Sequence, residues 1–246
     1  MKYISSCSFG KDSLATIILA KERGDPLDEV VYCEVMFDDH ISGEIPEHRK
    51  FIHDVAIPKL DDWGIRTVVL RSKSTYVSSF KRKIKAGESA GKIRAWPLCG
   101  KCCIQRDCKI PPIKKYKKSL GSDVVQYIGI ANDEQERLLR LDGVKRISLL
   151  QKYQVTEDMA CQICRDNGLL SPIYDFTTRG GCFFCPNAKN EELRHLRDYH
   201  PDLWQRLLDL QKLPNKVTEK FNRQFRIDEI DLLFQNEDNQ LSMFQK

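Results

Sequence analysis

The sequence predicts an α/β protein with a doubly wound, mostly parallel sheet and a small cysteine-rich, helical part toward its carboxyl end. Short apolar runs suited to buried strands alternate with amphipathic stretches in the first part of the chain. Eight of the ten cysteines fall into three groups. We expect an α/β domain over residues 1–150, a cysteine-rich helical metal-binding region over 151–235 and a flexible tail over 236–246.

The elements of the first part follow one another in β-α-β order. Residues 3–6 predict a strand, and apolar side chains at helical spacing predict a helix that ends near Gly24. The apolar run 29–37 predicts a buried parallel strand, and a further strand is expected over 66–70 with a helix between them. After a basic insertion, residues 123–129 predict another strand.

The composition indicates a cytoplasmic protein that is not associated with a membrane. Of the 246 residues, 41% are hydrophobic and 30% are charged, with a mean hydropathy of −0.47. No apolar run approaches ~18 residues, and the start of the chain lacks a signal-peptide pattern. The net charge of +5 suits an anionic substrate such as a nucleotide and permits a nucleic acid.

The connection between the first strand and the first helix reads Ser-Phe-Gly-Lys-Asp-Ser over residues 8–13. Gly10 allows a tight turn, and the unpaired N–H groups of a helix start favour an anion. Lys11 adds a mobile positive charge. The loop is therefore expected to bind phosphate, although it lacks the Walker A pattern; the alternative is a plain strand–turn–helix corner.

This loop resembles the S-G-G-x-D-S loop of the PP-loop ATP pyrophosphatases, with Phe9 in place of the first glycine. The resemblance implies a PP-loop, adenine nucleotide alpha hydrolase-like fold. It also implies that the loop holds nucleotide phosphates through Ser8, Phe9, Gly10, Lys11, Asp12 and Ser13.

Two later stretches resemble the phosphoadenosine phosphosulfate (PAPS) reductase family of that superfamily. Phe37-Asp38-Asp39-His40 and Ile45-Pro46-Glu47-His48 resemble F-D-T-G-x-x-F-P-E-T without its Thr-Gly pair. The resemblance makes Phe37 a nucleotide-binding residue and Asp38 a catalytic one, and a solvated turn is the alternative for Asp38.

The segment after residue 128 resembles the family's G-I-R-x-x-E-S-x-R-R, with Ala131 in place of the first arginine. The resemblance implies four residues that close the active site, although they also suit an acidic helix N-terminus: Gly129, Asp133, Glu134 and Arg137.

Two ligand schemes are open for a metal. Cys161-x2-Cys164 with Cys182-x2-Cys185 has the spacing of a structural Zn²⁺ site. Paired Cys102-Cys103 with Cys182-x2-Cys185 resembles the 4Fe-4S arrangement of adenylylsulfate reductases. Both schemes share Cys182 and Cys185, and Cys103 is the next candidate. Cys102 and Cys164 compete for the last position, and the weaker candidates are Cys99, Cys108 and Cys161.

Basic segments and the tail suggest macromolecular partners. Lys81–Lys85 and the lysine-rich stretch 114–118 suit phosphate or nucleic acid, or are simply solvated. Gln240–Phe244 resembles the Q-L-[SD]-L-F peptide that binds the bacterial DNA sliding clamp; an incidental apolar tail is the alternative.

The resemblance implies an ATP pyrophosphatase or adenylating sulfur transferase, with Lys11, Asp12 and Asp38 as catalytic residues and Mg²⁺ held by Asp12 or Asp38. A nucleic acid is the expected acceptor, as in DNA phosphorothioation, and a separate protein could donate the sulfur. Reductases of the family use a C-terminal E-C-G-[IL]-H motif, but no cysteine follows Cys185. The alternatives are a sulfonucleotide reductase without that cysteine and a nucleotide-binding or DNA-associated module with a structural metal.

Overall fold

The computed structural model describes residues 1–97 and 102–244. The chain forms two compact units that interleave along the sequence. The first comprises Met1–Glu34, Glu44–Ser72 and Lys109–Gly180. The second comprises Val35–Gly43, Lys73–Cys108 and Gly181–Lys246. The contiguous ranges 1–150 and 151–235 expected from the sequence are thus each divided between units, because the chain leaves the first unit after its second and third strands.

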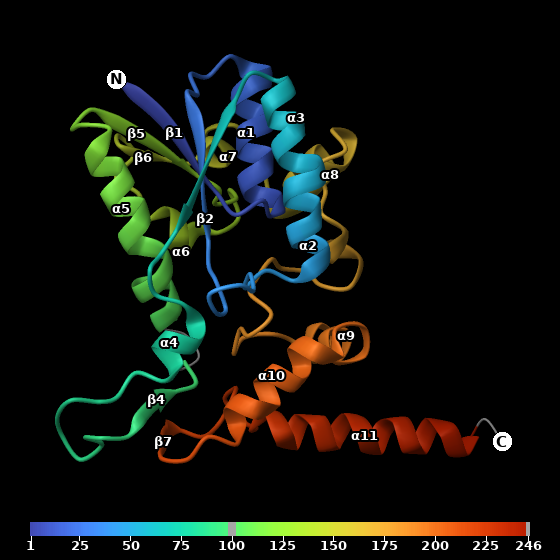
Figure 1. Ribbon diagram of the computed structural model, residues 1–246. Helices are drawn as coiled ribbons and strands as arrows, with labels where there is room; N and C mark the ends of the chain where they lie inside the picture. Colours follow the sequence, from blue (N-terminus) through green and yellow to red (C-terminus); the bar gives the residue numbers. More distant parts are fainter. Residues whose placement is uncertain (98–101, 245–246) are drawn as a thin grey trace. The chain divides into compact units, whose positions relative to one another are not determined.

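The first unit contains the predicted doubly wound sheet (Figure 1). All strand pairs are parallel, and the order is β3-β2-β1-β5-β6. Ile4 on β1 pairs with Glu29 on β2 and with Gln126 on β5. The strands are β1 (Lys2–Cys7), β2 (Glu29–Glu34), β3 (Arg66–Arg71), β5 (Val124–Ile128) and β6 (Arg146–Ile147). The predicted strand 29–37 is shorter than expected, ending at Glu34.

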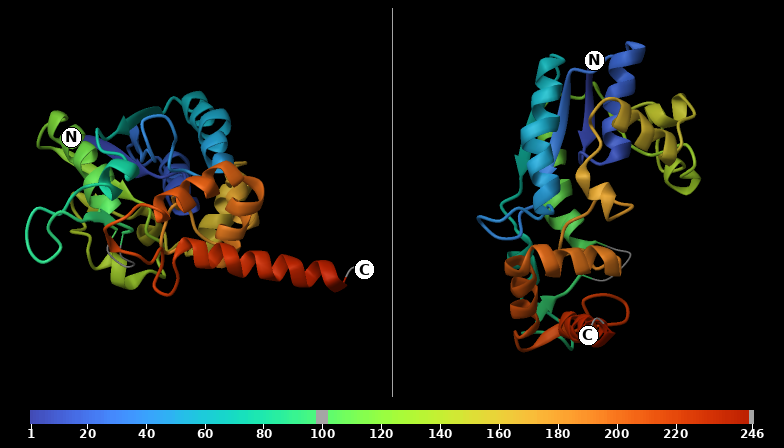
Figure 2. Two further views of the ribbon diagram at one scale, coloured as in Figure 1. Left: turned by 60° about the horizontal axis from the view of Figure 1, so that its bottom comes forward. Right: turned by 90° about the vertical axis from the view of Figure 1, so that its right-hand side faces the viewer.

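Helices cover both faces of this sheet (Figures 1 and 2). One face carries α1 (Lys11–Arg23), a continuous helical segment and α8 (Glu157–Asp166), and the opposite face carries α5 (Ile110–Ser119). The continuous segment is α2 (Pro46–Phe51), the π-helical η1 (Ile52–Ala56) and α3 (Ile57–Asp62). The shorter helices are α6 (Gln135–Leu138), α7 (Leu149–Lys152) and η3 (Pro172–Asp175). No helix in the described ranges combines the length and apolarity that crossing a membrane requires.

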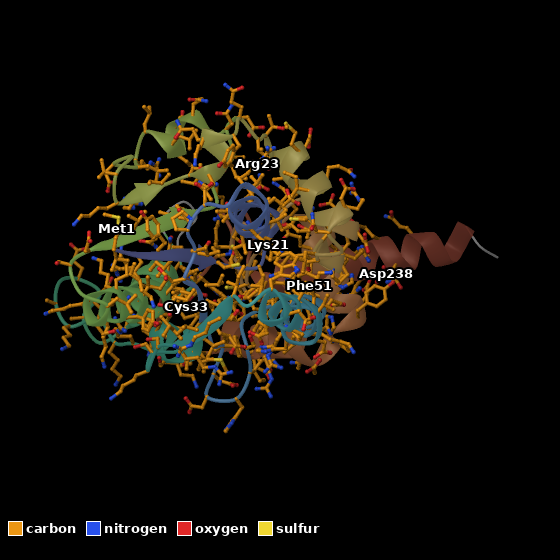
Figure 3. All side chains as sticks on the ribbon, turned by 90° about the horizontal axis from the view of Figure 1, so that it is seen from above. Met1, Lys21, Arg23, Cys33, Phe51 and Asp238 are labelled. Carbon is orange, nitrogen blue, oxygen red and sulfur yellow. The ribbon has the colours of Figure 1, made fainter. Side chains whose placement is uncertain are left out.

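The first helix is built as its sequence predicts. Leu14, Ile17 and Ile18 are buried against the sheet, whereas Lys21 and Arg23 are exposed near its end (Figure 3). Gly24 ends the helix with a left-handed φ of 70°. Because only residues 8–10 connect β1 to α1, the N-terminus of α1 lies at the carboxyl end of β1.

The second unit is built around aromatic side chains. Its elements are α4 (Tyr76–Phe80), β4 (Ile93–Ala95), α9 (Asn190–Tyr199), α10 (Pro201–Gln211), β7 (Lys216–Thr218) and α11 (Ile227–Phe244), with η2 (Gln105–Lys109) at its edge. Trp96 contacts Phe80 and Phe221 edge to face, with ring centroids 5.0 and 5.1 Å apart. Its indole N–H donates to Gln211 Oε1 at 2.8 Å. The described part of the basic insertion that follows β3 is thus partly helical, and it also contributes a strand and a buried tryptophan.

The tail expected from residue 236 is helical. Helix α11 continues to Phe244, and ion pairs with α9 hold this stretch: Asp238 (Figure 3) accepts from Arg194 at 2.6 Å and from Arg197 at 2.8 Å. Two acidic residues of the expected flexible tail, Glu237 and Asp238, are thus paired with arginines from another helix. The side chains of the clamp-like peptide after Gln240 lie outside the described residues, so clamp binding stays a prediction.

Phe9 takes the backbone conformation that a glycine usually takes. Its φ is 58°, in the left-handed region. The side chain is fully buried and contacts the Tyr32 ring edge to face, with centroids 5.2 Å apart. Burial of the ring offsets the backbone cost of about 1–2 kcal/mol. The departure from S-G-G-x-D-S therefore preserves the turn of the loop.

We predict that Phe9→Gly is at least as stable as Phe9→Ala. Both lose the buried ring at a cost of about 3–5 kcal/mol, but alanine alone keeps a Cβ at positive φ. The control pair is Leu14→Ala and Leu14→Gly inside α1, where glycine should be less stable by about 1 kcal/mol. Urea unfolding of the four variants measures this, and the same order at both positions would refute a strained turn at Phe9.

Candidate functional site

The loop between β1 and α1 is held in one conformation by its own hydrogen bonds. Ser13 Oγ donates to the Gly10 carbonyl at 2.9 Å and accepts from the Ser8 amide at 3.3 Å. The Gly10 carbonyl also accepts from the Leu14 amide at 3.0 Å, which starts the helix. The first-turn amides of α1 have no acceptors within the helix and present the positive end of its dipole. Ser8, Gly10 and Ser13 thus form a hydrogen-bonded turn at a helix start, and their part in binding an anion stays a prediction.

Two residues far along the chain hold the start of α1. The Lys11 amide donates to Tyr174 Oη at 2.8 Å, and the Cys164 thiol donates to the Lys11 carbonyl at 3.1 Å. Burial of Cys164 raises the pKa of its thiol to about 12, so it stays protonated as a donor at neutral pH. Cys164, a predicted metal ligand, thus makes a structural contact within the first unit.

Lys11 carries the positive charge of the loop. Its side chain is only 10% exposed, and Nζ lies 2.9 Å from Asp12 Oδ1 and 2.7 Å from Glu157 Oε2. Burial lowers the pKa of Lys11, but the hydrogen bonds to Glu157 and Asp12 outweigh it and raise the pKa above its ordinary value. Burial also raises the pKa of Asp12, against the opposing effect of Lys11. Lys11 is therefore a fixed cation at the helix start.

The stretch after β5 closes against the loop. A Cβ atom at Gly129 would lie 2.7 Å from the Asp12 carbonyl carbon and 2.7 Å from the Ser13 nitrogen, so only glycine fits there. Asp133 accepts from the Glu157 amide at 3.2 Å. Glu134 accepts from the Ala131 amide at 3.1 Å.

Arg137 forms an ion pair with Glu134, another residue of the predicted site. Its guanidinium pairs with Glu134, which precedes it by one helical turn. Of the predicted set, Gly129 packs against the loop, whereas Asp133 contacts the Glu157 amide and Glu134 pairs with Arg137.

Three further residues at the loop could not be identified from the sequence. Tyr174 and Glu157 contact Lys11 as described, and His48 is buried with Nε2 3.1 Å from the Ser8 carbonyl and Nδ1 2.8 Å from Ser171 Oγ. Because a carbonyl only accepts, Nε2 donates, and in a neutral ring Nδ1 accepts from the Ser171 hydroxyl. Tyr174 lies 163 residues from Lys11, and no spacing rule connects them.

Phe37 and Asp38 belong to the second unit. Phe37 is buried, with its ring 5.5 Å from that of Tyr76 and 5.0 Å from that of Phe183. Asp38 Oδ1 accepts from the amides of His40 and Ile41, and Oδ2 lies 3.4 Å from an Arg206 nitrogen. These contacts give Phe37 a packing role and Asp38 a turn-capping role, and their predicted parts in nucleotide and Mg²⁺ binding stay predictions.

Four predicted metal ligands lie in the second unit around Tyr76. The turn Cys182–Cys185 is closed by the Cys185 amide donating to the Cys182 carbonyl at 3.0 Å, and Phe184 within it stacks on Tyr76 with centroids 4.0 Å apart. Burial raises the pKa of Tyr76 well above its ordinary value, and negative charge at Cys103, Cys185, Cys102 and Cys182 would raise it further. The buried phenol is thus sensitive to charge at all four cysteines.

The donor set at Tyr76 fits a thiolate-bound group. Tyr76 Oη is buried and has no hydrogen-bond partner among the described residues, which is costly unless something bound at the cysteines accepts from it. No three of the described cysteine sulfurs lie within 4.8 Å of one another. A single Zn²⁺ with bonds of ~2.3 Å needs sulfurs about 3.8 Å apart, whereas a cluster holds them farther apart. Cys99 lies outside the described residues.

Arginines surround the Cys102–Cys103 side of this group. Arg94 hydrogen-bonds to Cys103, and its guanidinium lies 2.6 Å from Asp107 Oδ2. Burial raises the pKa of Cys103, and Arg94 opposes this. Asp107 has its pKa lowered to about 2, chiefly by its hydrogen bond to Arg106. Cys108 is buried beside Ser79, with Sγ 3.7 Å from Oγ, in a packing position.

Comparisons with known proteins give distant likenesses. No family model matches the chain. An uncharacterized protein of Methanocaldococcus jannaschii is 27% identical over 210 residues, which is 81% of this chain but only 39% of that protein. The structure of the U34-tRNA thiolase NcsA from Methanococcus maripaludis, with its 4Fe-4S cluster, gives a TM-score of 0.43 at 18% identity, covering 85% of this chain and 72% of that one. The PAPS reductase resemblance therefore stays a prediction.

We predict that Gly129→Ala distorts the loop between β1 and α1. The new methyl group would meet backbone atoms of Asp12 and Ser13, so the loop or β5 must shift, at about 1–3 kcal/mol. Gly180→Ala is the control, because its nearest neighbour would be 3.9 Å away. Thermal unfolding and nucleotide titration of both variants measure the effect. Wild-type stability and binding in Gly129→Ala would refute the close packing.

Proposed function

We propose that the protein is a PP-loop-type enzyme that binds ATP and transfers its adenylyl group to a substrate oxygen, as a step of sulfur transfer. The main support for this proposal is the Ser8–Ser13 loop, which combines a helix N-terminus, a nearly buried Lys11 and the close approach of Gly129. The left-handed turn at Phe9 supports retained function, because the chief departure from the loop pattern leaves its shape intact.

The residues of the first unit suit cleavage between the α and β phosphates. The Asp12 and Ser13 amides would hold phosphate oxygens, since the Lys11 amide already donates to Tyr174. The Lys11 side chain would stabilise charge that develops as an acceptor oxygen attacks the α-phosphorus and pyrophosphate leaves. Asp12, 25% exposed beside Lys11, offers a carboxylate to Mg²⁺, and Asp38 is the second candidate for that role. Gly129 and Tyr174 would keep the helix start in position.

The second unit would hold the cofactor for the sulfur chemistry. Cys102, Cys103, Cys182 and Cys185 would ligate a 4Fe-4S cluster, with Tyr76 Oη as a hydrogen-bond donor beside it. Such a cluster supplies a site that binds sulfur. Arg94 would balance the charge of the Cys103 thiolate. This set excludes Cys164, whose thiol donates to the Lys11 carbonyl.

The acceptor we propose is a nucleic acid. Exposed lysines lie on both units and suit phosphate contacts: Lys81, Lys83, Lys85 and Lys92 on the second, and Lys114, Lys115 and Lys118 on the first. A sulfur-donor protein and the DNA sliding clamp, the latter through Gln240–Phe244, are the partners we propose to test.

We predict that Lys11→Ala lowers pyrophosphate release at least ~100-fold, because the charge on the α-phosphoryl group loses its partner. Lys21→Ala is the control: Lys21 is exposed on the same helix, and its removal should leave the rate unchanged. Coupled pyrophosphate assays with candidate nucleic-acid acceptors measure both. Equal turnover of Lys11→Ala and wild type would exclude this role.

We predict about four iron and four sulfide per chain after anaerobic purification, with brown colour. Cys182→Ser and Cys185→Ser should lose both, and Cys161→Ser should keep them. One zinc per chain without sulfide, lost in Cys161→Ser, would favour the structural zinc scheme instead.

A further inference from the structure

Lys11 is already neutralised by two carboxylates. Nζ lies 2.9 Å from Asp12 and 2.7 Å from Glu157, and its side chain is 10% exposed. An ammonium has three N–H donors, and these two contacts use most of that capacity. A phosphate oxygen bonded to Nζ at ~2.8 Å would have to share the ammonium with both carboxylates.

The two carboxylates differ in how they are attached. Asp12 is the neighbour of Lys11 on the same turn, and its carboxylate is 25% exposed. Glu157 comes from the first residue of α8, and its carboxylate is 44% exposed. Its backbone amide is held separately by Asp133, at 3.2 Å. The Glu157 side chain can therefore turn to solvent while α8 stays in place.

From this arrangement we propose that Glu157 competes with nucleotide phosphate for Lys11, so that binding requires its carboxylate to leave the ammonium. The inference rests on the proposed function of the loop. Two anions bound to one ammonium lie only a few ångströms apart and repel each other in a partly buried site. Glu157 thus keeps Lys11 charged and ordered before binding. The ammonium is available to phosphate only in the fraction of molecules in which Glu157 has left it, and the apparent nucleotide affinity is lowered by that fraction.

Helix α8 provides a matched control. Asp158 is the next residue on the same first turn, and its side chain is exposed. Glu157→Gln and Asp158→Asn each remove one negative charge near the helix N-terminus and thus change the dipole environment alike. Only the first removes the anion that contacts Lys11.

The test is titration calorimetry with α,β-methylene ATP and Mg²⁺ on the full chain at fixed salt. Glu157→Gln should bind about fivefold more tightly than wild type, and Asp158→Asn should stay within about twofold. Glu157→Asp, whose shorter side chain withdraws from Nζ, should also bind more tightly. This variant controls for a change in folding caused by the glutamine. In a Lys11→Ala background the effect of Glu157→Gln should vanish.

Unchanged or weaker binding by Glu157→Gln overturns the proposal; weaker binding would make Glu157 a ligand of the nucleotide or of its cation. The proposed function fails separately. If wild type does not bind the analogue, or Lys11→Ala binds it as well as wild type does, the loop is not a phosphate site, whatever the Glu157 variants show.

Discussion

The site depends on the reversal of the chain between β1 and α1. Phe9 turns through a left-handed conformation that its buried ring stabilises, and the helix that follows starts at the carboxyl end of the central strand. Gly129 on the neighbouring strand leaves room for that start. In a sheet of order β3-β2-β1-β5-β6 the topological switch lies between β1 and β5, where ligands bind in open α/β sheets. The site follows from this one turn and the packing around it.

Local sequence was sufficient for the loop and most of the sheet. Strand and helix periodicity, and the turn at Gly10 and Ser13, depend on residues that are close in sequence. The local sequence pattern therefore predicted these structures. The contacts of Lys11 with Glu157 and Tyr174 span 146 and 163 residues and depend on how α8 and η3 pack. No periodicity encodes such contacts. The helical tail was missed for the same reason, since its acidic residues are paired with arginines of α9.

The spacing of the cysteines predicted a metal centre but did not decide between its ligand sets. Their grouping indicated a metal centre, but both ligand schemes used Cys182 and Cys185, so spacing alone left the remaining ligands open. The fold separates the candidates by environment: Cys164 donates to a backbone carbonyl in the first unit, whereas Cys102 and Cys103 lie in the second unit with Cys182 and Cys185. Burial and hydrogen bonding thus distinguish residues that look equivalent in sequence.

The central claim is that the loop after β1 binds the phosphates of a nucleotide. The most direct test is a crystal structure of the protein with α,β-methylene ATP and Mg²⁺. The account predicts phosphate oxygens at the Asp12 and Ser13 amides, with one of the oxygens in hydrogen-bond contact with Lys11 Nζ. A nucleotide bound elsewhere, with the Lys11–Glu157 ion pair intact, would contradict it.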